Sequence, residues 1–330
     1  MRSVCLLGVK AELGAGTRGA SLGFDAVKIA SLSKNKSFFQ QYPYQEIAIS
    51  NDALFHTSPH IFAKNIDEIL KNQITICEQV HLCLKKNHFP FIISGDHSSA
   101  SATIAGIKKT FPDKTLGVIW IDAHADLHSP YTTPSGNMHG MPVAIALAED
   151  NITEKINEVP PITALYWEKL KNLGVKGAKF SPNHLVYVSV RDTEPQEEAF
   201  IAKNKIRNYT VEEIRRRSVE VVVREILEEK LADCDLIYIS FDVDSMDSSI
   251  SVGTGTPVAG GLSVTEAKEI NALLVQDIRV CAWEMVEINP LLDTKGNKMG
   301  EVAFEVMEST LQSSKKTKSY EKSEITSLSI

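Results

Sequence analysis

Two short acidic stretches contain the residue types in this chain that are best suited to chemistry. DAHAD occupies residues 122–126, and FDVD occupies residues 241–244. Each stretch directly follows an apolar run that we expect to be a buried strand, where unpaired carboxylates would cost the fold several kcal/mol each. A partner must therefore neutralise these charges, and the nature of that partner largely decides the function.

The spacing within the stretches predicts that their ionisable side chains converge. Residues at alternate positions of an extended segment point the same way. With a histidine that follows another apolar run, they form a set of four carboxylates and two imidazoles: His97, Asp122, His124, Asp126, Asp242 and Asp244. Two carboxylates about 4 Å apart repel by roughly 4 kcal/mol at an effective dielectric of about 20. Two divalent cations would balance four such charges, so we predict a dinuclear metal site.

The ligand types in this set narrow the choice of metal. Oxygen-rich ligation with a minority of imidazole favours Mn²⁺ over metals that prefer thiolates. We therefore expect two Mn²⁺ ions per chain, and Co, Ni, Fe and Zn remain alternatives. For any single residue of the set, the alternative is a helix cap or a charged surface loop.

Apolar runs with helical patterns between them predict the elements that position these residues. The runs are continuous and not alternating, which is typical of a parallel sheet covered on both faces; they span residues 3–9, 89–94, 115–121, 185–190, 236–241 and 280–286. A helical stripe runs through 66–84, and Thr210 with Glu213 and Ser263 with Glu266 fit capping boxes. We predict a single three-layer α/β/α domain with a mostly parallel central sheet over residues 1–311, followed by a polar tail at 312–330.

Charged or ligating residues follow five of the apolar runs at the end where a parallel sheet binds ligands. These residues are Asp96 and His97; Asp122, His124 and Asp126; Arg191, Asp192 and Glu194; Asp242 and Asp244; and Glu287. Five strands are thus expected to deliver functional groups to one edge of the sheet.

Composition excludes several classes of partner. The net charge of −7 disfavours nucleic acid, and no run of 18 apolar residues exists to span a membrane. The five cysteines are scattered and form no CxxC pair, so we expect reduced thiols in a cytoplasmic protein. Arg215–Arg217 lie among glutamates and are expected on a solvated helix face, with a subunit interface as the alternative.

At this point the chain resembles the ureohydrolases, a family of dinuclear manganese enzymes that includes arginase and agmatinase. The matching motifs occur in family order along nearly the whole chain: SGDHS (94–98), DAHAD (122–126), SGNMHGMP (135–142), VRDTEP (190–195), SFDVDSMD (240–247), TGTPVAGGL (254–262) and EINP (287–290). The SGNMHGMP and TGTPVAGGL segments look more like arginase than agmatinase.

The resemblance implies a role for each candidate residue. One metal would be held by His97, Asp122, Asp126 and Asp242, and the other by His124, Asp122, Asp242 and Asp244. Asp126 would also steer the nucleophilic water that attacks the guanidinium carbon. Glu287 would accept hydrogen bonds from the guanidinium, and His139 would pass a proton to the leaving amine.

The resemblance also implies a substrate-binding set: His128, Thr133, Ser135, Asn137, Glu194 and Thr256. Two of these positions depart from the arginase pattern. His128 stands where Asn usually contacts the carboxylate of the amino acid, and Glu194 stands where Asp usually contacts its α-amino group. A glutamate reaches roughly 1.5 Å further than an aspartate, by one carbon–carbon bond.

The expected activity is hydrolysis of a guanidino group to urea and an amine, with L-arginine to L-ornithine as the first candidate. The alternatives within the family are agmatine, another guanidino acid and formiminoglutamate. A mononuclear zinc deacetylase and a non-catalytic metal-binding protein are alternatives of other classes. The resemblance further implies a homo-oligomer, a trimer or a hexamer.

Overall fold

Eight parallel strands form one sheet at the centre of the molecule, which we describe from a computed structural model over residues 3–316. The strands are β1 (Ser3–Val9), β2 (Tyr44–Glu46), β3 (His88–Ser94), β4 (Leu116–Ile121), β5 (Leu185–Val188), β6 (Arg207–Tyr209), β7 (Leu236–Asp242) and β8 (Val280–Val286). Their order across the sheet is β2-β1-β3-β8-β7-β4-β5-β6. Every pairing is parallel, which confirms the predicted sheet.

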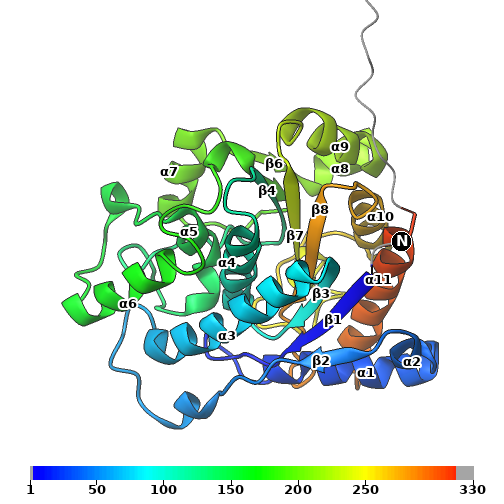
Figure 1. The fold of residues 1–330 in the computed structure, drawn as a ribbon, viewed down its shortest axis with the longest axis horizontal. Helices are drawn as coiled ribbons and strands as arrows, with labels where there is room; N and C mark the ends of the chain where they lie inside the picture. Colours follow the sequence, from blue (N-terminus) through cyan, green and yellow to red (C-terminus); the bar gives the residue numbers. More distant parts are fainter. Residues whose placement is uncertain (1–2, 317–330) are drawn as a thin grey trace, which may run out of the picture.

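Helices cover both faces of this sheet (Figure 1). The helices on one face are α1 (Gly23–Lys34), α2 (Phe38–Gln41), α8 (Val211–Arg217), α9 (Val219–Glu225), α10 (Val264–Leu274) and α11 (Lys298–Ser314). The helices on the other side are α3 (Ile66–Lys85), α4 (Ala100–Thr110), α5 (Pro142–Leu147), α6 (Pro161–Lys171) and α7 (Pro195–Asn204). A separate apolar core lies between the sheet and each helix layer, as the continuous apolar runs predict.

All six predicted strands are present, and two others were missed. The missed strands, β2 and β6, have three residues each, YQE and RNY, and form the two edges of the sheet. They carry little apolar character because an edge strand is partly solvated. Within residues 3–316, no helix is long and apolar enough to span a membrane.

The predicted helical signals are mostly correct. Helix α3 buries six of the seven apolar residues that form the predicted stripe, Ile66, Ile69, Leu70, Cys77, Val80 and Leu84. The seventh, Ile74, is 45% exposed, and the neighbouring Gln73 is buried instead. Gln73 is tolerated inside because its amide donates to Ser98 O at 2.8 Å. The capping box at Ser263 is complete, whereas Thr210 caps Glu213 N in one direction only.

The last helix extends past the predicted start of the C-terminal tail. Helix α11 continues through Ser314, three residues into the predicted polar tail, and residues 317–330 lie outside the described part of the chain. All five cysteines lie outside any disulfide, as predicted. Arg215 binds Glu266, and Arg217 binds Glu213 and Glu225, so this basic run is neutralised by neighbouring acids.

Candidate metal centre and substrate cavity

The six predicted metal ligands lie at or just after the carboxyl ends of three strands, β3, β4 and β7, in the middle of the sheet. At each of these ends an aspartate turns back on the chain. The backbone N–H two residues later donates to its Oδ1, at 2.9 Å for Asp96, 2.8 Å for Asp122 and 2.7 Å for Asp242. This is an Asx turn, which ends the strand. At Asp122 and Asp242 the other oxygen, Oδ2, faces His97, whereas Oδ2 of Asp96 accepts from Gly14 N at 2.9 Å.

The predicted convergence is therefore present, but its local cause differs from the extended geometry that we predicted. Regular strand ends at Ile121, and Asp126 has a left-handed φ of 51°. Such a conformation costs a non-glycine residue energy and is held by surrounding contacts. Leu127 N donates to Glu197 Oε1 at 2.9 Å, which fixes the chain directly after Asp126.

His97 and His124 each organise one half of the cluster. His97 Nδ1 lies 3.1, 3.0 and 3.2 Å from Oδ2 of Asp122, Asp126 and Asp242, respectively. His124 Nδ1 lies 3.1 Å from Asp244 Oδ2 and 3.5 Å from Asp122 Oδ1. The two oxygens of Asp122 thus face different halves, which is the position of a bridging ligand. Ligand atoms of His97, Asp122 and Asp242, and of Asp122, His124 and Asp244, form two groups with metal-like spacing.

Buried polar atoms without partners show that this site fits cations. His97 Nδ1 and Asp122 Oδ2 are both buried and have no hydrogen-bond partner. Such atoms are costly and rare unless an ion or a water satisfies them. Burial, reinforced by neighbouring carboxylates, raises the pKa of Asp242 well above its usual range and that of Asp244 to about 6. Divalent cations would relieve both the repulsion and the missing bonds, and the nitrogen and oxygen donors suit Mn²⁺.

A chain of hydrogen bonds sets the orientation and tautomer of His97. Glu284, buried in β8, accepts from Tyr238 Oη–H at 2.8 Å and from Ser94 Oγ–H at 2.5 Å. Tyr238 is also bonded to Ser240, whose Oγ lies 2.7 Å from His97 Nε2.

The directions of these bonds follow from the proton that each hydroxyl carries. Tyr238 gives its one proton to Glu284, so Ser240 must donate to Tyr238. Ser240 then accepts from His97 Nε2–H, and the Nδ1 lone pair is left facing the carboxylates. The ring is also held flat on Trp120, with ring centroids 4.2 Å apart.

His139 and Glu287, the predicted proton shuttle and guanidinium acceptor, contact each other beside the metal cluster. His139 Nδ1 lies 3.2 Å from Glu287 Oε1, which also accepts from His97 N at 2.9 Å. Burial lowers the pKa of His139, but the hydrogen bond and charge of Glu287 outweigh it and raise the value to about 9. For Glu287 burial raises the pKa, and His139 outweighs that and holds the value below its usual range. The pair is therefore charged at neutral pH.

A cavity of about 290 Å³ opens onto the cluster, and every predicted substrate-binding residue lines it. The lining includes His128, Thr133, Ser135, Asn137, Glu194 and Thr256, together with His97, His124, Asp126, His139, Asp242, Asp244 and Glu287. Thr256 Oγ1 donates to Asp244 Oδ2 at 3.3 Å, so this residue also supports a candidate ligand.

The two residues that depart from the arginase pattern bind each other at the cavity rim. His128 Nε2 lies 3.0 Å from Glu194 Oε2 and 3.7 Å from Glu197 Oε2. The hydrogen bond from His128 lowers the pKa of Glu194 to about 2, whereas burial raises that of Glu197 to about 8. His128 and Glu194 thus form a paired donor and acceptor.

Glu197 lines the cavity but was absent from the predicted site, and Asp192, which was predicted among the charged groups at the strand ends, had been given no role there. A signal for Glu197 existed in the sequence. It stands three residues after Glu194, with Pro195 between them, and its Oε2 accepts from Glu194 N at 3.2 Å, as in a helix-start box. Asp192 lies 3.7 Å from His124 Nε2, a contact made across loops that no local pattern indicates.

Comparisons with known proteins agree with this geometry. The model of the Arginase family matches residues 2–312. An arginase from Bacillus subtilis (strain 168) is 32% identical over 312 residues, covering 94% of this chain and 98% of that protein.

Solved structures show the same likeness. A crystal structure of arginase from Bacillus subtilis has a TM-score of 0.77 at 32% identity, covering 94% of this chain and 98% of that one. The native structure of arginase from Bacillus caldovelox has a TM-score of 0.80 at 30% identity, with the same coverage of both chains. The chain therefore belongs to the arginase family.

Proposed function

We propose that this protein hydrolyses the guanidino group of L-arginine to give L-ornithine and urea, using two Mn²⁺ ions. The strongest support comes from Asp122, whose two oxygens face two different His–Asp clusters: Oδ2 lies near His97 and Oδ1 near His124. In these clusters the ligand atoms are crowded together or lack hydrogen-bond partners. A site for a single cation needs no carboxylate that faces two clusters. The first ion would be held by His97, Asp122, Asp126 and Asp242, and the second by His124, Asp122, Asp244 and Asp242.

The bound ions would supply Lewis-acid chemistry and lower the pKa of a water molecule toward neutrality. The remaining steps fall to side chains. Asp126, whose Oδ2 faces the cluster, orients the attacking water and takes its proton. Asp242 Oδ2 lies 3.2 Å from His97 Nδ1, and Asp242 Oδ1 accepts from Asp244 N. Because only one Asp242 oxygen faces a histidine, its proposed bridging role rests on the family resemblance.

Glu287 and His139 bind the guanidinium and complete the proton transfers. The planar guanidinium donates in a fork that suits a carboxylate such as Glu287. His139, protonated at neutral pH because of its raised pKa, is placed to give a proton to the leaving amine. Their 3.2 Å contact keeps both groups oriented at one wall of the cavity.

The rim supports an amino acid as the substrate. The far end of arginine carries a carboxylate and an ammonium group, whereas agmatine carries no carboxylate there. The rim offers hydrogen-bond donors in His128 and Ser135 and an acceptor in Glu194, which complement both groups of a zwitterion.

Product analysis across a substrate panel tests this proposal. Purified protein should release urea from L-arginine when Mn²⁺ is present, with kcat/KM at least about tenfold above that for agmatine. Formamide from formiminoglutamate, or faster urea release from agmatine, would assign the chain to another branch of the family. No product from any substrate at saturating Mn²⁺ would overturn the proposal.

We also propose that the protein is a homo-oligomer, a trimer or a hexamer, on the support of the family resemblance. Light scattering coupled to size-exclusion chromatography tests this, and a monomer at all concentrations would contradict it.

A further inference from the structure

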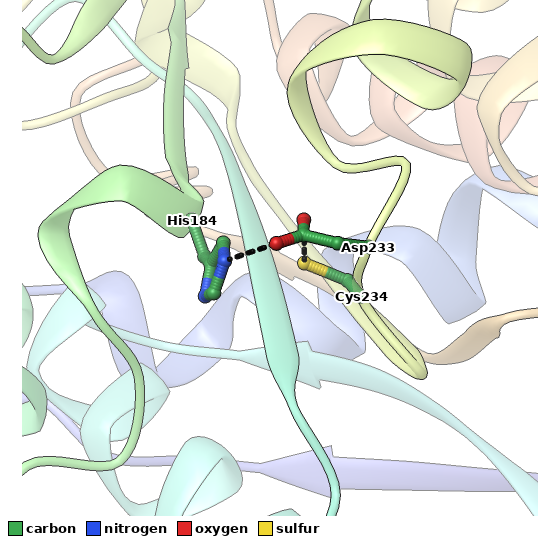
Figure 2. Close-up of side chains that lie close together, drawn as sticks. All are labelled: His184, Asp233 and Cys234. Carbon is green, nitrogen blue, oxygen red and sulfur yellow. Dashed lines mark hydrogen bonds and ion pairs between the residues drawn. The ribbon is translucent and has the colours of Figure 1, made fainter.

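A second group of metal-ligand side chains lies at the opposite edge of the sheet. His184 directly precedes β5, and Asp233 and Cys234 lie just before β7, so all three stand at the amino ends of their strands. The candidate dinuclear centre lies at the carboxyl ends. Figure 2 shows the three side chains facing one another, with β4, the strand between β5 and β7 in the sheet, passing between them in this view.

The ligand atoms of this group have the spacing of a metal site. His184 Nε2 lies 3.2 Å from Asp233 Oδ2, and Cys234 Sγ lies 4.0 Å from Asp233 Oδ1. One nitrogen, one oxygen and one sulfur fall within 4.8 Å of one another. A tetrahedral cation with bonds of about 2.0–2.3 Å places neighbouring ligands roughly 3.3–3.8 Å apart. The separations of 3.2 Å and 4.0 Å from Asp233 lie within about 0.2 Å of that range.

The surroundings leave the group free to take a cation. In the part of the chain that the structure describes, His184 is the one histidine, lysine or arginine with a side-chain nitrogen within 4.0 Å of the Asp233 carboxylate. The nearby Lys114 and Arg279 are bound to Asp235 and Asp277. The Asp233 side chain is 73% exposed, so water could complete the coordination from solvent.

Cys234 gives the group its chemical selectivity. Its thiol is buried, and burial raises its pKa to about 12, so the sulfur keeps its proton unless a cation displaces that proton to solvent. Without a cation, the side chain is simply part of the apolar core beside Gly117. A thiolate, an imidazole and one carboxylate match zinc-like cations and not the oxygen-seeking Mn²⁺ or Mg²⁺.

We propose that His184, Asp233 and Cys234 bind one zinc-class divalent cation, which ties together the segments that lead into β5 and β7. This site would be separate from the dinuclear centre, and nothing in the proposed reaction uses its three residues. Because β7 carries Asp242 at its other end, the bound cation would stabilise the strand on which the dinuclear centre depends.

Cadmium binding to the full-length, Mn²⁺-loaded protein tests this inference. Cd²⁺ bound to a thiolate absorbs in the ultraviolet, and the dinuclear centre contains no sulfur, so the two sites are distinguished by this signal. We expect one Cd²⁺ per chain with thiolate absorption, and loss of that absorption in Cys234→Ser. Cys281→Ser, which removes a half-buried thiol of β8, is the matched control and should leave the absorption unchanged.

Two surface variants keep the test decisive if Cys234→Ser folds poorly. His184→Ala and Asp233→Asn should each weaken Cd²⁺ binding by at least about tenfold, because each removes or discharges a ligand. Absorption that persists in Cys234→Ser, or Cd²⁺ affinity that is unchanged in both surface variants, would overturn the proposal. So would the absence of a thiolate signal from the unmodified protein.

Discussion

Asp122 and Asp126 both face His97 in the metal cluster, but their pKa values are shifted in opposite directions. The neighbouring imidazoles of His124 and His97 outweigh the effect of burial and hold the pKa of Asp122 far below its usual range. Burial and the neighbouring Asp122 raise the pKa of Asp126. A carboxylate with a raised pKa is suited to accept a proton, which agrees with the role proposed for Asp126.

Asp126→Asn should therefore reduce kcat for arginine by about a hundredfold or more, since the amide keeps the shape but cannot take a proton. Circular dichroism and bound-metal analysis should show a folded protein that still binds manganese. Turnover close to that of the unmodified protein would contradict the assignment.

The bonds behind His97 predict an effect on metal affinity. In Tyr238→Phe, Ser240 loses its acceptor and becomes free to donate to His97 Nε2, which allows the tautomer with a proton on Nδ1. We expect Mn²⁺ affinity to fall about tenfold, measured by metal titration independently of activity. Tyr209→Phe removes a partly buried hydroxyl that donates to Glu225 and does not contact the cluster, and an equal loss there would show a general structural effect.

The rim pair predicts coupled behaviour. Glu194→Asp should separate the carboxylate from His128, and His128→Asn should leave Glu194 without its 3.0 Å partner. Each change should raise KM for arginine by about tenfold, and the double variant should cost less than the sum of the two. Improved arginine kinetics in both single variants would show that the rim is adapted to another substrate.

At the residue scale, the sequence was sufficient where ligands are close along the chain. Asp122, His124 and Asp126 are recognisable from their spacing after an apolar run. The contact between His128 and Glu194 joins residues that are 66 positions apart, and it depends on how two loops pack. No periodicity in either loop indicates that contact.

At the scale of elements, strand ends and helix starts determine where the site forms. The Asx turns after β3, β4 and β7 stop each strand at the same edge, so ligands from distant segments meet there. Continuous apolar runs made these strands predictable. The edge strands β2 and β6 were not predictable, because three partly solvated residues have no distinctive pattern.

The start of α10 allows a direct measure of one such signal. Ser263 Oγ accepts from Glu266 N at 3.2 Å, and Glu266 accepts in return from Ser263 N at 2.7 Å. Ser263→Ala should lower the free energy of unfolding by about 1 kcal/mol, measured by urea denaturation. Ser33→Ala, at an exposed site near the end of α1, should change it much less, and equal losses would argue against the cap.

At the scale of the whole molecule, the three-layer fold buries an acidic cluster that is stable only when its charge is balanced. A ligand that binds only the folded state stabilises it by about 2.7 kcal/mol at a hundredfold excess over its Kd. Mn²⁺ should therefore raise the midpoint of thermal unfolding, and a chelator should lower it. Asp244→Asn should reduce the shift, whereas an unfolding midpoint indifferent to Mn²⁺ would show that the cluster is balanced in another way.

The most direct test counts manganese and urea in the same sample. Metal-free protein should gain two tightly bound Mn²⁺ ions per chain at the dinuclear centre, and urea release from L-arginine should rise with their uptake and fall on chelation. Urea release at full rate without any divalent metal would contradict the account. So would a protein that binds no pair of Mn²⁺ ions and releases no urea.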